Sequence, residues 1–221
     1  MSRKLYELAA ADETLLFSPY CWRTKLALAH KNLEYETIPW RFTEKDAIAF
    51  SGQGKVPVLV DGARTIHDSE IIAEYLEATY PNEPALFADP AARAITRFVK
   101  SWTEDVLHPL VARIVLPDIF VKLDPRDKAY FRDSRERAWG MTIEDINAQR
   151  PAATKALTAG LAPLRGTLKA QPFIAGTAPA YADHIIFGAL QWAVLTSATP
   201  LLGEEPIIAA WMSAVLECYG L

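Results

Sequence analysis

Ser18 combines two features that suit it to chemistry on a thiol. It precedes Pro19 and a run in which Trp22 and Leu26 recur at helical spacing, which predicts that Ser18 caps a helix. A hydroxyl donor and a helix N-terminus each lower the pKa of a nearby thiol, and Ser18 would supply both at one point. From the residues alone, the simpler interpretation is an N-cap without a catalytic role.

Two neighbours of Ser18 are weaker candidates. Cys21 stands where the second cysteine of a C-x-x-C redox pair would stand, but Ser18 occupies the first position, which argues against a dithiol mechanism. A thiol one turn into a helix can still be partly reactive, but we interpret Cys21 as structural or as a residue that supports the site from behind. Tyr20 supplies a second hydroxyl, but it occupies an unremarkable helical position.

The clearest local structure in the sequence spans residues 55–80. Residues 58–60 form a short apolar run, Asp61-Gly62 is a hairpin turn signal, and a return strand follows. Asp68 and Ser69, both good N-cap types, then open a helix with an apolar face. The stretch therefore predicts strand, hairpin, strand and an immediate helix N-terminus.

Two features of this stretch favour ligand binding. A helix start has free N–H groups and a positive dipole end, which attract a carboxylate. Val56-Pro57 lies at the mouth of a strand, where a cis peptide bond would turn the Val56 N–H and C=O toward a ligand. The alternative interpretation is a stable hairpin followed by a well-capped helix, with no ligand.

The first part of the chain alternates strands and helices. Residues 4–8 and 33–38 have strand patterns, and Thr43 with Asp46 predicts a short helix between the second strand and the hairpin. The resulting order, βαβαββα, predicts an α/β, thioredoxin-like N-terminal domain over residues 1–81.

Helical periods dominate the rest of the chain. Residues 82–88 are rich in turn formers and are interpreted as a linker, and residues 89–221 are predicted to form an all-helical C-terminal domain. Pro109 and Pro117 are expected to kink or break its first long helix. Further helices are predicted at residues 127–137, 151–169, 182–195 and 205–219, with a short one opened by Thr142 and Asp145.

Composition limits the partners. The chain has 221 residues, 51% of them hydrophobic, and a net charge of −4, which gives no reason to expect nucleic acid or an anionic membrane as partner. It shows no long uncharged apolar run and no signal-peptide core. Two cysteines and four histidines lack metal-ligand spacing. We expect a reduced, cytoplasmic protein without a metal.

Several motifs together resemble one known family. KVPVLVDG at residues 55–62, followed by HDSEIIAEYL, resembles the glutathione-binding core of the cytosolic glutathione S-transferases, and SPYCWRTK at residues 18–25 resembles their catalytic segment. RDSRERAWGMTIEDINAQR and FIAGTAPAYADHIIFGALQW are similar to the bacterial β-etherase branch and its fungal relatives. The resemblance covers most of the chain and is strongest in the N-terminal domain.

The resemblance implies a role for each matching residue. Ser18 would hold the sulfur of glutathione, a co-substrate, as a thiolate. Val56 would pair through its backbone with the cysteinyl part, and Pro57 would be the cis-proline. Asp68 and Ser69 would take the γ-glutamyl end.

Two cations and three aromatic side chains complete the set of candidates. Lys55 resembles the residue that meets the glycine carboxylate in some classes, and Arg41 is a further candidate cation there, although a solvated surface charge is the simpler interpretation. The electrophile would lie between the two domains, with Trp40, Phe98 and Trp102 as candidate walls; an aromatic stripe is also typical of a core.

The leading hypothesis is a transferase that delivers glutathione to a hydrophobic, aromatic electrophile. The alternatives are glutathione-dependent β-aryl ether cleavage, an isomerase or peroxidase using the same thiolate, and a non-catalytic binding module. The last predicts loss of the Ser18 hydroxyl or of the Asp68-Ser69 pair, and both are present. The family resemblance also implies a homodimer.

One departure from the family pattern concerns the start of the helix near residue 182. The family commonly places a serine, threonine or asparagine at the cap, where this chain has Ala180. Asp183 is retained three residues later and is expected to be structural. Loss of a capping side chain costs about 1 kcal/mol, so this helix start is expected to be slightly weakened.

Overall fold

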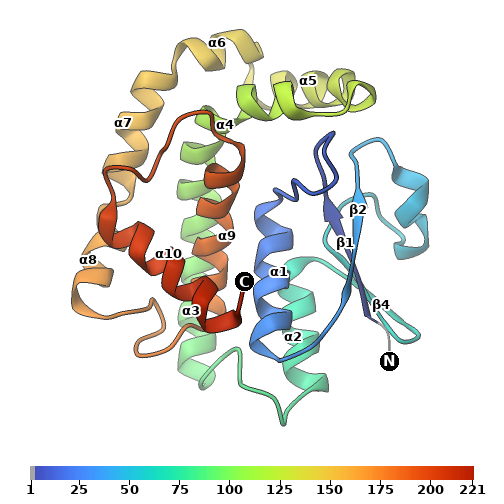
Figure 1. The fold of residues 1–221 in the computed structure, drawn as a ribbon, viewed down its shortest axis with the longest axis vertical. Coiled ribbons are helices and arrows are strands. Elements are labelled where there is room, and N and C mark those ends of the chain that lie inside the picture. The colour runs from blue at the N-terminus through green and yellow to red at the C-terminus, as the bar shows by residue number, and fades with distance from the viewer. Residues whose placement is uncertain (1–2) are drawn as a thin grey trace.

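A computed structural model describes residues 3–221, and its first part is a mixed sheet with α-helices on one face and a 3-10 helix on the other (Figure 1). The elements, in order, are β1 (Arg3–Leu8), α1 (Pro19–His30), β2 (Glu36–Trp40), the 3-10 helix η1 (Lys45–Ser51), β3 (Val58–Asp61), β4 (Arg64–His67) and α2 (Ser69–Thr79). The predicted βαβαββα order and the thioredoxin-like N-terminal domain are confirmed, with a 3-10 helix in the middle position.

The strand order is β2-β1-β3-β4, with β1 parallel to β2 and antiparallel to β3. The second strand begins later than predicted, because the Leu33 N–H still closes the end of α1 on the Leu28 carbonyl at 3.0 Å. The predicted capping of η1 by Thr43 and Asp46 is wrong. The Thr43 N–H and hydroxyl instead donate to Asp127 Oδ1, at 2.9 and 2.6 Å, and so tie this segment to the helical part of the chain.

The sheet buries apolar side chains under α1 and α2. Leu5 and Leu59, from neighbouring strands, pack with Leu28 of α1 and Ile72 of α2 in one buried cluster. Removal of this apolar surface from water fixes both helices on the same face of the sheet. The N-terminus of α1 is thereby positioned at the boundary with the helical domain (Figure 1).

The rest of the described chain is helical, as predicted. The helices are α3 (Pro90–Trp102), α4 (His108–Lys122), α5 (Pro125–Trp139), α6 (Ile143–Ala148), α7 (Arg150–Gly160), α8 (Ala162–Ala170), α9 (Tyr181–Thr196) and α10 (Pro206–Tyr219). Thr142 and Asp145 form the predicted capping box of α6. The helix predicted over residues 151–169 is two helices, and Pro163 lies in the first turn of the second, where proline is favoured.

The two prolines of the long helix behave differently. A π-helical turn, η2 (Thr103–Leu107), joins α3 to α4 just before Pro109. Proline lacks an N–H and clashes with the carbonyl four residues earlier, and a wider turn relieves both problems. Pro117, by contrast, lies inside α4 without ending it, so of the predicted kink or break the break does not occur.

Helix α9 crosses α1 at very short range, and Gly188 makes this possible. A Cβ atom at Gly188 would lie 2.3 Å from the Pro19 carbonyl oxygen, a distance that no side chain tolerates. The close crossing places the first turn of α1, which carries Ser18, firmly against the helical domain. No helix among residues 3–221 is long and apolar enough to span a bilayer.

Asp183 is structural, as expected, and it compensates for Ala180. Its buried carboxylate accepts N–H groups from Ile174, Ala175 and Ala180 at 2.7–3.1 Å and from the Trp211 indole at 3.0 Å. These bonds join the loop before α9 to α10. The Ala180 N–H is therefore satisfied even though its own side chain caps nothing.

Candidate functional site

Ser18 caps α1 and borders a cavity. Its backbone is extended, with φ −65° and ψ 126°, and its Oγ accepts the Cys21 N–H at 3.3 Å. The residue is only 4% exposed, yet it lines the cavity between the two domains. Since the bond to Cys21 uses an oxygen lone pair, the hydroxyl proton stays available for donation to a ligand.

Cys21 lies in the first turn of α1, three residues after Ser18, and is buried. Burial is the main cause that raises the pKa of its thiol to about 12. A neutral, inaccessible thiol is a poor nucleophile, which fits the structural role expected for it.

The two free cysteines should therefore differ sharply in reactivity. Cys218 is exposed, whereas Cys21 is buried. We expect one equivalent of an aromatic disulfide reagent to react quickly with the native protein, and Cys218→Ser to abolish that fast phase. A fast phase that survives in Cys218→Ser would show that Cys21 is reactive after all.

The Val56-Pro57 peptide bond is cis. In the part of the chain that the structure describes, no hydrogen bond joins the Val56 N–H or C=O to another residue, and β3 begins only at Val58. Val56 also lines the cavity. Both backbone groups are thus placed to pair with an extended peptide-like ligand.

The start of α2 has the expected cap in an unusual backbone conformation. Asp68 has φ 72° and ψ 129°, rare for a residue with a side chain, and its Oδ1 accepts the N–H groups of Glu70 and Ile71 at 2.9 and 3.2 Å. Strain of this kind persists where surrounding contacts hold it, and it clusters at ligand sites. Ser69 is buried, and its carbonyl accepts the Tyr181 hydroxyl of α9 at 2.7 Å.

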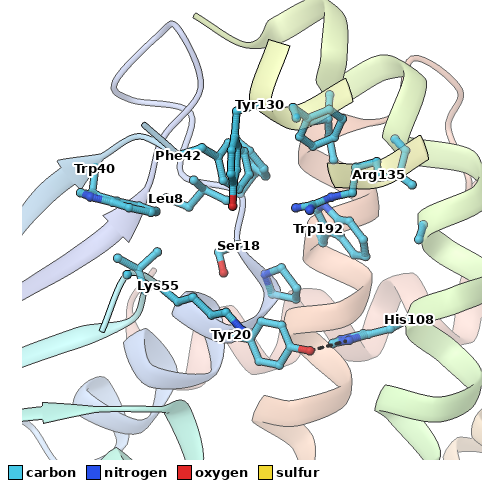
Figure 2. Close-up of a pocket in the computed structure, with 18 of the residues that line it drawn as sticks. Leu8, Ser18, Tyr20, Trp40, Phe42, Lys55, His108, Tyr130, Arg135 and Trp192 are labelled. Atoms are coloured by element: carbon cyan, nitrogen blue, oxygen red, sulfur yellow. Dashed lines mark hydrogen bonds between the residues drawn. The ribbon is translucent and has the colours of Figure 1, made fainter. Parts of the chain in front are cut away.

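A cavity of about 440 Å³ lies between the sheet and the helical domain, and Figure 2 shows Ser18 among the residues that line it. Its walls are mostly apolar and aromatic: Leu8, Phe17, Trp40, Phe42, Ala112, Leu116, Ile119, Tyr130, Phe131, Trp139 and Trp192. A cavity of this size and character suits a small aromatic molecule.

Only some of the residues expected around the site line the cavity. Ser18, Trp40, Lys55 and Val56 line the cavity. Pro57 follows Val56 across the cis bond and is buried in the sheet domain. Asp68 and Ser69 lie at the start of α2, outside the cavity lining.

Three of the expected residues lie away from the cavity. Arg41 is engaged elsewhere, since its guanidinium contacts Glu13 at 3.0 Å and Glu44 at 3.4 Å and donates to the Ala10 carbonyl. Phe98 is 70% exposed, and neither it nor Trp102 lines the cavity. Helical spacing placed both on one apolar stripe, but the described structure turns that stripe away from the cavity.

Sequence reasoning missed two cations at the cavity. Lys45 of η1 donates to the Gly54 carbonyl at 2.6 Å and lies over the Trp40 ring, and burial lowers its pKa. Arg135 of α5 lies over Phe42 and Phe131, 5.5 and 4.9 Å from their ring centres. Neither has a sequence signal, because each meets its partners only through tertiary packing.

Sequence reasoning also missed His108, and it named Tyr20 only as a weaker candidate. Both line the cavity, and Figure 2 shows the Tyr20 hydroxyl turned toward the His108 ring, whose Nδ1 lies 3.4 Å away. Tyr20 belongs to α1 and His108 to α4, so no local pattern connects them. Among the described residues there is no cluster of three metal-ligating side chains.

The comparisons with known proteins place the chain in a family. The "Glutathione S-transferase, N-terminal domain" family matches residues 14–84, and the "Glutathione S-transferase, C-terminal domain" family matches residues 94–201. Together these matches cover most of the chain. A thioredoxin-like domain followed by a helical domain, with a cavity between them, is the architecture found here, and the chain belongs to the glutathione S-transferase family.

The individual relatives have low sequence identity to this chain, but they match it over most of its length. A probable glutathione S-transferase of Oryza sativa subsp. japonica is 25% identical over 88% of this chain and 78% of its own length. A glutathione S-transferase of Ceriporiopsis subvermispora, solved in complex with glutathione, is 26% identical with a TM-score of 0.84, over 100% of this chain and 98% of its own. A glutathione transferase of Phanerochaete chrysosporium has the same fold, with a TM-score of 0.88. It is 24% identical over 99% of this chain and 97% of its own.

Proposed function

We propose that this chain binds glutathione along the sheet domain, ionises its thiol beside Ser18 and transfers the thiolate to an aromatic electrophile in the cavity. One observation carries the proposal. Ser18 stands at the N-terminus of α1, with a hydroxyl proton free to donate, on the edge of an apolar cavity that also borders the unpaired Val56 backbone.

The thiolate is stabilised by two effects at one place. The first turn of α1 presents the positive end of the helix dipole, and Ser18 donates a hydrogen bond to the charged sulfur. Both effects favour the anion over the thiol, whose ordinary pKa is about 8.5. The apolar cavity keeps water away from the sulfur and strengthens both interactions.

The rest of the tripeptide is held by groups on either side of Ser18. The Val56 backbone pairs with the cysteinyl residue, next to the cis bond to Pro57. Asp68 takes the γ-glutamyl ammonium, and Ser69 with the N-terminus of α2 takes its carboxylate. Lys55 takes the glycine carboxylate.

The second cation at the glycine end is Lys45. It replaces Arg41, which is held by carboxylates outside the cavity. Lys45 and Lys55 both line the cavity, and the charge of Lys55 helps to lower the pKa of Lys45, as expected for two nearby cations. An anionic group between them would relieve this repulsion.

The electrophile is aromatic, because the cavity walls supply ring surfaces for stacking and edge contacts. A narrower proposal is the displacement of an aryloxide from a carbon next to a ketone. It is supported by the similarity of residues 132–150 and 173–192 to the β-etherase branch. Disulfide chemistry is disfavoured by the burial of Cys21.

The proposal is tested by turnover with a panel of three electrophiles. Glutathione is supplied with a chloronitroaromatic, a β-aryl ether ketone or an aromatic hydroperoxide, and thioether, phenol or oxidised glutathione is measured. Thioether formation from the first two supports a transferase. Oxidation of glutathione by the hydroperoxide, with no thioether from either of the others, would contradict it.

The homodimer is proposed on the exposed apolar side chains of α2 and α3. Ile71, Ile95 and Phe98 are 55%, 64% and 70% exposed. The ion pair between Lys100 and Glu70, at 3.2 Å, holds the two helices together. Exposed apolar surface of this kind marks interaction sites.

Phe98→Asp is expected to shift the protein toward the monomer in sedimentation experiments, because it puts a charge into an apolar interface. Val121→Asp is the matched control, since Val121 is 74% exposed on α4. A monomeric wild-type protein, or equal effects of both variants, would rule out this interface.

A further inference from the structure

Tyr20 presents a second hydroxyl to the cavity, separate from Ser18. It is 38% exposed and lines the cavity wall, on the first turn of α1. Its hydroxyl oxygen lies 3.4 Å from Nδ1 of His108, the contact drawn in Figure 2. Which of these two groups donates the hydrogen decides what Tyr20 can do for a ligand.

A buried arginine behind the pair settles the direction. Arg23 is 0% exposed, and its guanidinium lies over the Tyr20 ring, 4.8 Å from its centre. One guanidinium nitrogen donates to Glu104 Oε1 at 2.7 Å, and the other lies 3.4 Å from His108 Nε2. Arg23, held by Glu104, therefore faces the far side of the His108 ring.

Arginine only donates hydrogen bonds, so Nε2 of His108 must be the acceptor in this contact. His108 is 8% exposed, and burial together with the charge of Arg23 lowers its pKa to about 3, so the ring is neutral near pH 7. A neutral imidazole has a single N–H, which is then on Nδ1. The Nδ1–H donates to the Tyr20 oxygen.

Because His108 donates this hydrogen bond, the phenol proton of Tyr20 stays free. A phenol O–H lies close to the ring plane, and the side facing His108 is occupied by the incoming hydrogen bond. The proton therefore turns to the other side. Burial raises the pKa of Tyr20, so the group stays protonated and can donate.

We propose that Tyr20 donates a hydrogen bond to an oxygen of the electrophile, and that His108 and Arg23 are positioning residues that fix the direction of this bond. The inference rests on the proposed function and narrows its substrate class to aromatic electrophiles that carry an acceptor oxygen conjugated to the reacting carbon. An aromatic α,β-unsaturated ketone is the simplest member.

The chemistry balances without a further reactant. The thiolate sulfur supplies the electron pair of the new C–S bond at the β-carbon. The C=C π pair shifts toward the carbonyl, whose oxygen becomes an enolate held by the Tyr20 hydroxyl. Water then protonates the α-carbon, and the hydroxide left behind is neutralised by the proton that the thiol released on ionisation. Tyr20 acts where negative charge develops, so its effect is largest in the transition state.

Binding tests the hydrogen bond without any reaction. Benzophenone and diphenylmethane share a skeleton and differ in the carbonyl oxygen, and neither needs glutathione to bind. Calorimetry gives, for each protein, the ratio of its affinity for benzophenone to its affinity for diphenylmethane. We expect this ratio to be about fivefold higher in the wild type than in Tyr20→Phe, the size of one neutral hydrogen bond. Equal preference in both proteins would overturn the proposal, whatever the fate of the thiolate.

Turnover tests the same bond in the transition state. The readout is the ratio of the rates with benzylideneacetone and with benzyl chloride, which lacks an acceptor oxygen. Tyr20→Phe is expected to lower this ratio by about 10- to 100-fold, the size of one hydrogen bond to a charged oxygen. Tyr6→Phe, which removes a phenol outside the described cavity lining, is the matched control and should leave the ratio in place.

His108 supplies a further readout that a purely structural role would not move. His108→Phe is expected to lower the ratio, and His108→Asn to restore part of it, because the asparagine amide can donate from the position of Nδ1. If Tyr20→Phe instead slows both electrophiles equally, or raises the pKa of bound glutathione, Tyr20 serves packing or the thiol and the proposal is wrong. Absence of turnover in the wild type with intact ketone preference would count against the proposed function alone.

Discussion

Replacing Ser18 with alanine is expected to lower kcat by about 10- to 100-fold, because a hydrogen bond to a charged group contributes about 1.5–3 kcal/mol. The same loss should raise the pKa of bound glutathione by about 1–2 units, at 1.36 kcal/mol per unit. Glutathione affinity should change little, since in the proposed binding mode Val56, Lys55 and the start of α2 hold the rest of the tripeptide. Turnover, thiolate absorbance and calorimetry measure the three quantities.

The control for this variant must separate catalysis from capping. Ser18 also caps α1, so its loss costs about 1 kcal/mol of stability whatever its chemical role. Asp89→Ala removes the cap of α3, where Asp89 Oδ1 accepts the Ala92 N–H at 2.7 Å, outside the cavity lining. It should lose similar stability with normal turnover. A Ser18→Ala protein that loses glutathione binding while thiol ionisation stays the same would show that our assignment is wrong.

Asp183→Ala is expected to cost about 3–4 kcal/mol in the free energy of unfolding, the largest stability loss that we predict. The carboxylate is fully buried and accepts four N–H groups, from the loop before α9 and from Trp211. Alanine leaves these donors without partners, and each buried orphan group costs about 1–3 kcal/mol before relaxation. For a chain of this size the Tm should fall by roughly 10 °C.

Asp145→Ala provides the matched comparison. Asp145 accepts the Thr142 N–H at 3.4 Å in the capping box of α6, but it is exposed, so its loss should cost only about 1 kcal/mol. Chemical denaturation of the two variants measures the difference directly. Equal losses would mean that the Asp183 network contributes no more than an ordinary helix cap.

The sequence predicts best where structure is set by near neighbours. The hairpin, the Asp68 cap and the Thr142–Asp145 capping box each depend on residues within a few positions of one another, and the structure has all three. Pro109 also acts as expected, because its effect on a helix is local. Pro117 does not end its helix, since α4 continues past it, so the break that was one of its two expected effects does not occur.

The cavity is harder to predict because its walls come from distant segments. Helical spacing assigns Phe98 to an apolar stripe, but only tertiary packing determines that Phe98 is exposed. The sequence offers Arg41 as a cation for the glycine carboxylate, but it does not show that Glu13 and Glu44 already pair with it. Tyr20 and His108 are separated by 88 positions, so nothing local indicates that they meet.

The central claim, a glutathione thiol ionised beside Ser18, is tested most directly by the ultraviolet absorbance of the thiolate in the complex of the wild-type protein with glutathione, followed as a function of pH. We predict an apparent pKa about 1–2 units below the ordinary value of about 8.5 for a thiol. Saturating glutathione with an unshifted thiol pKa would contradict the account.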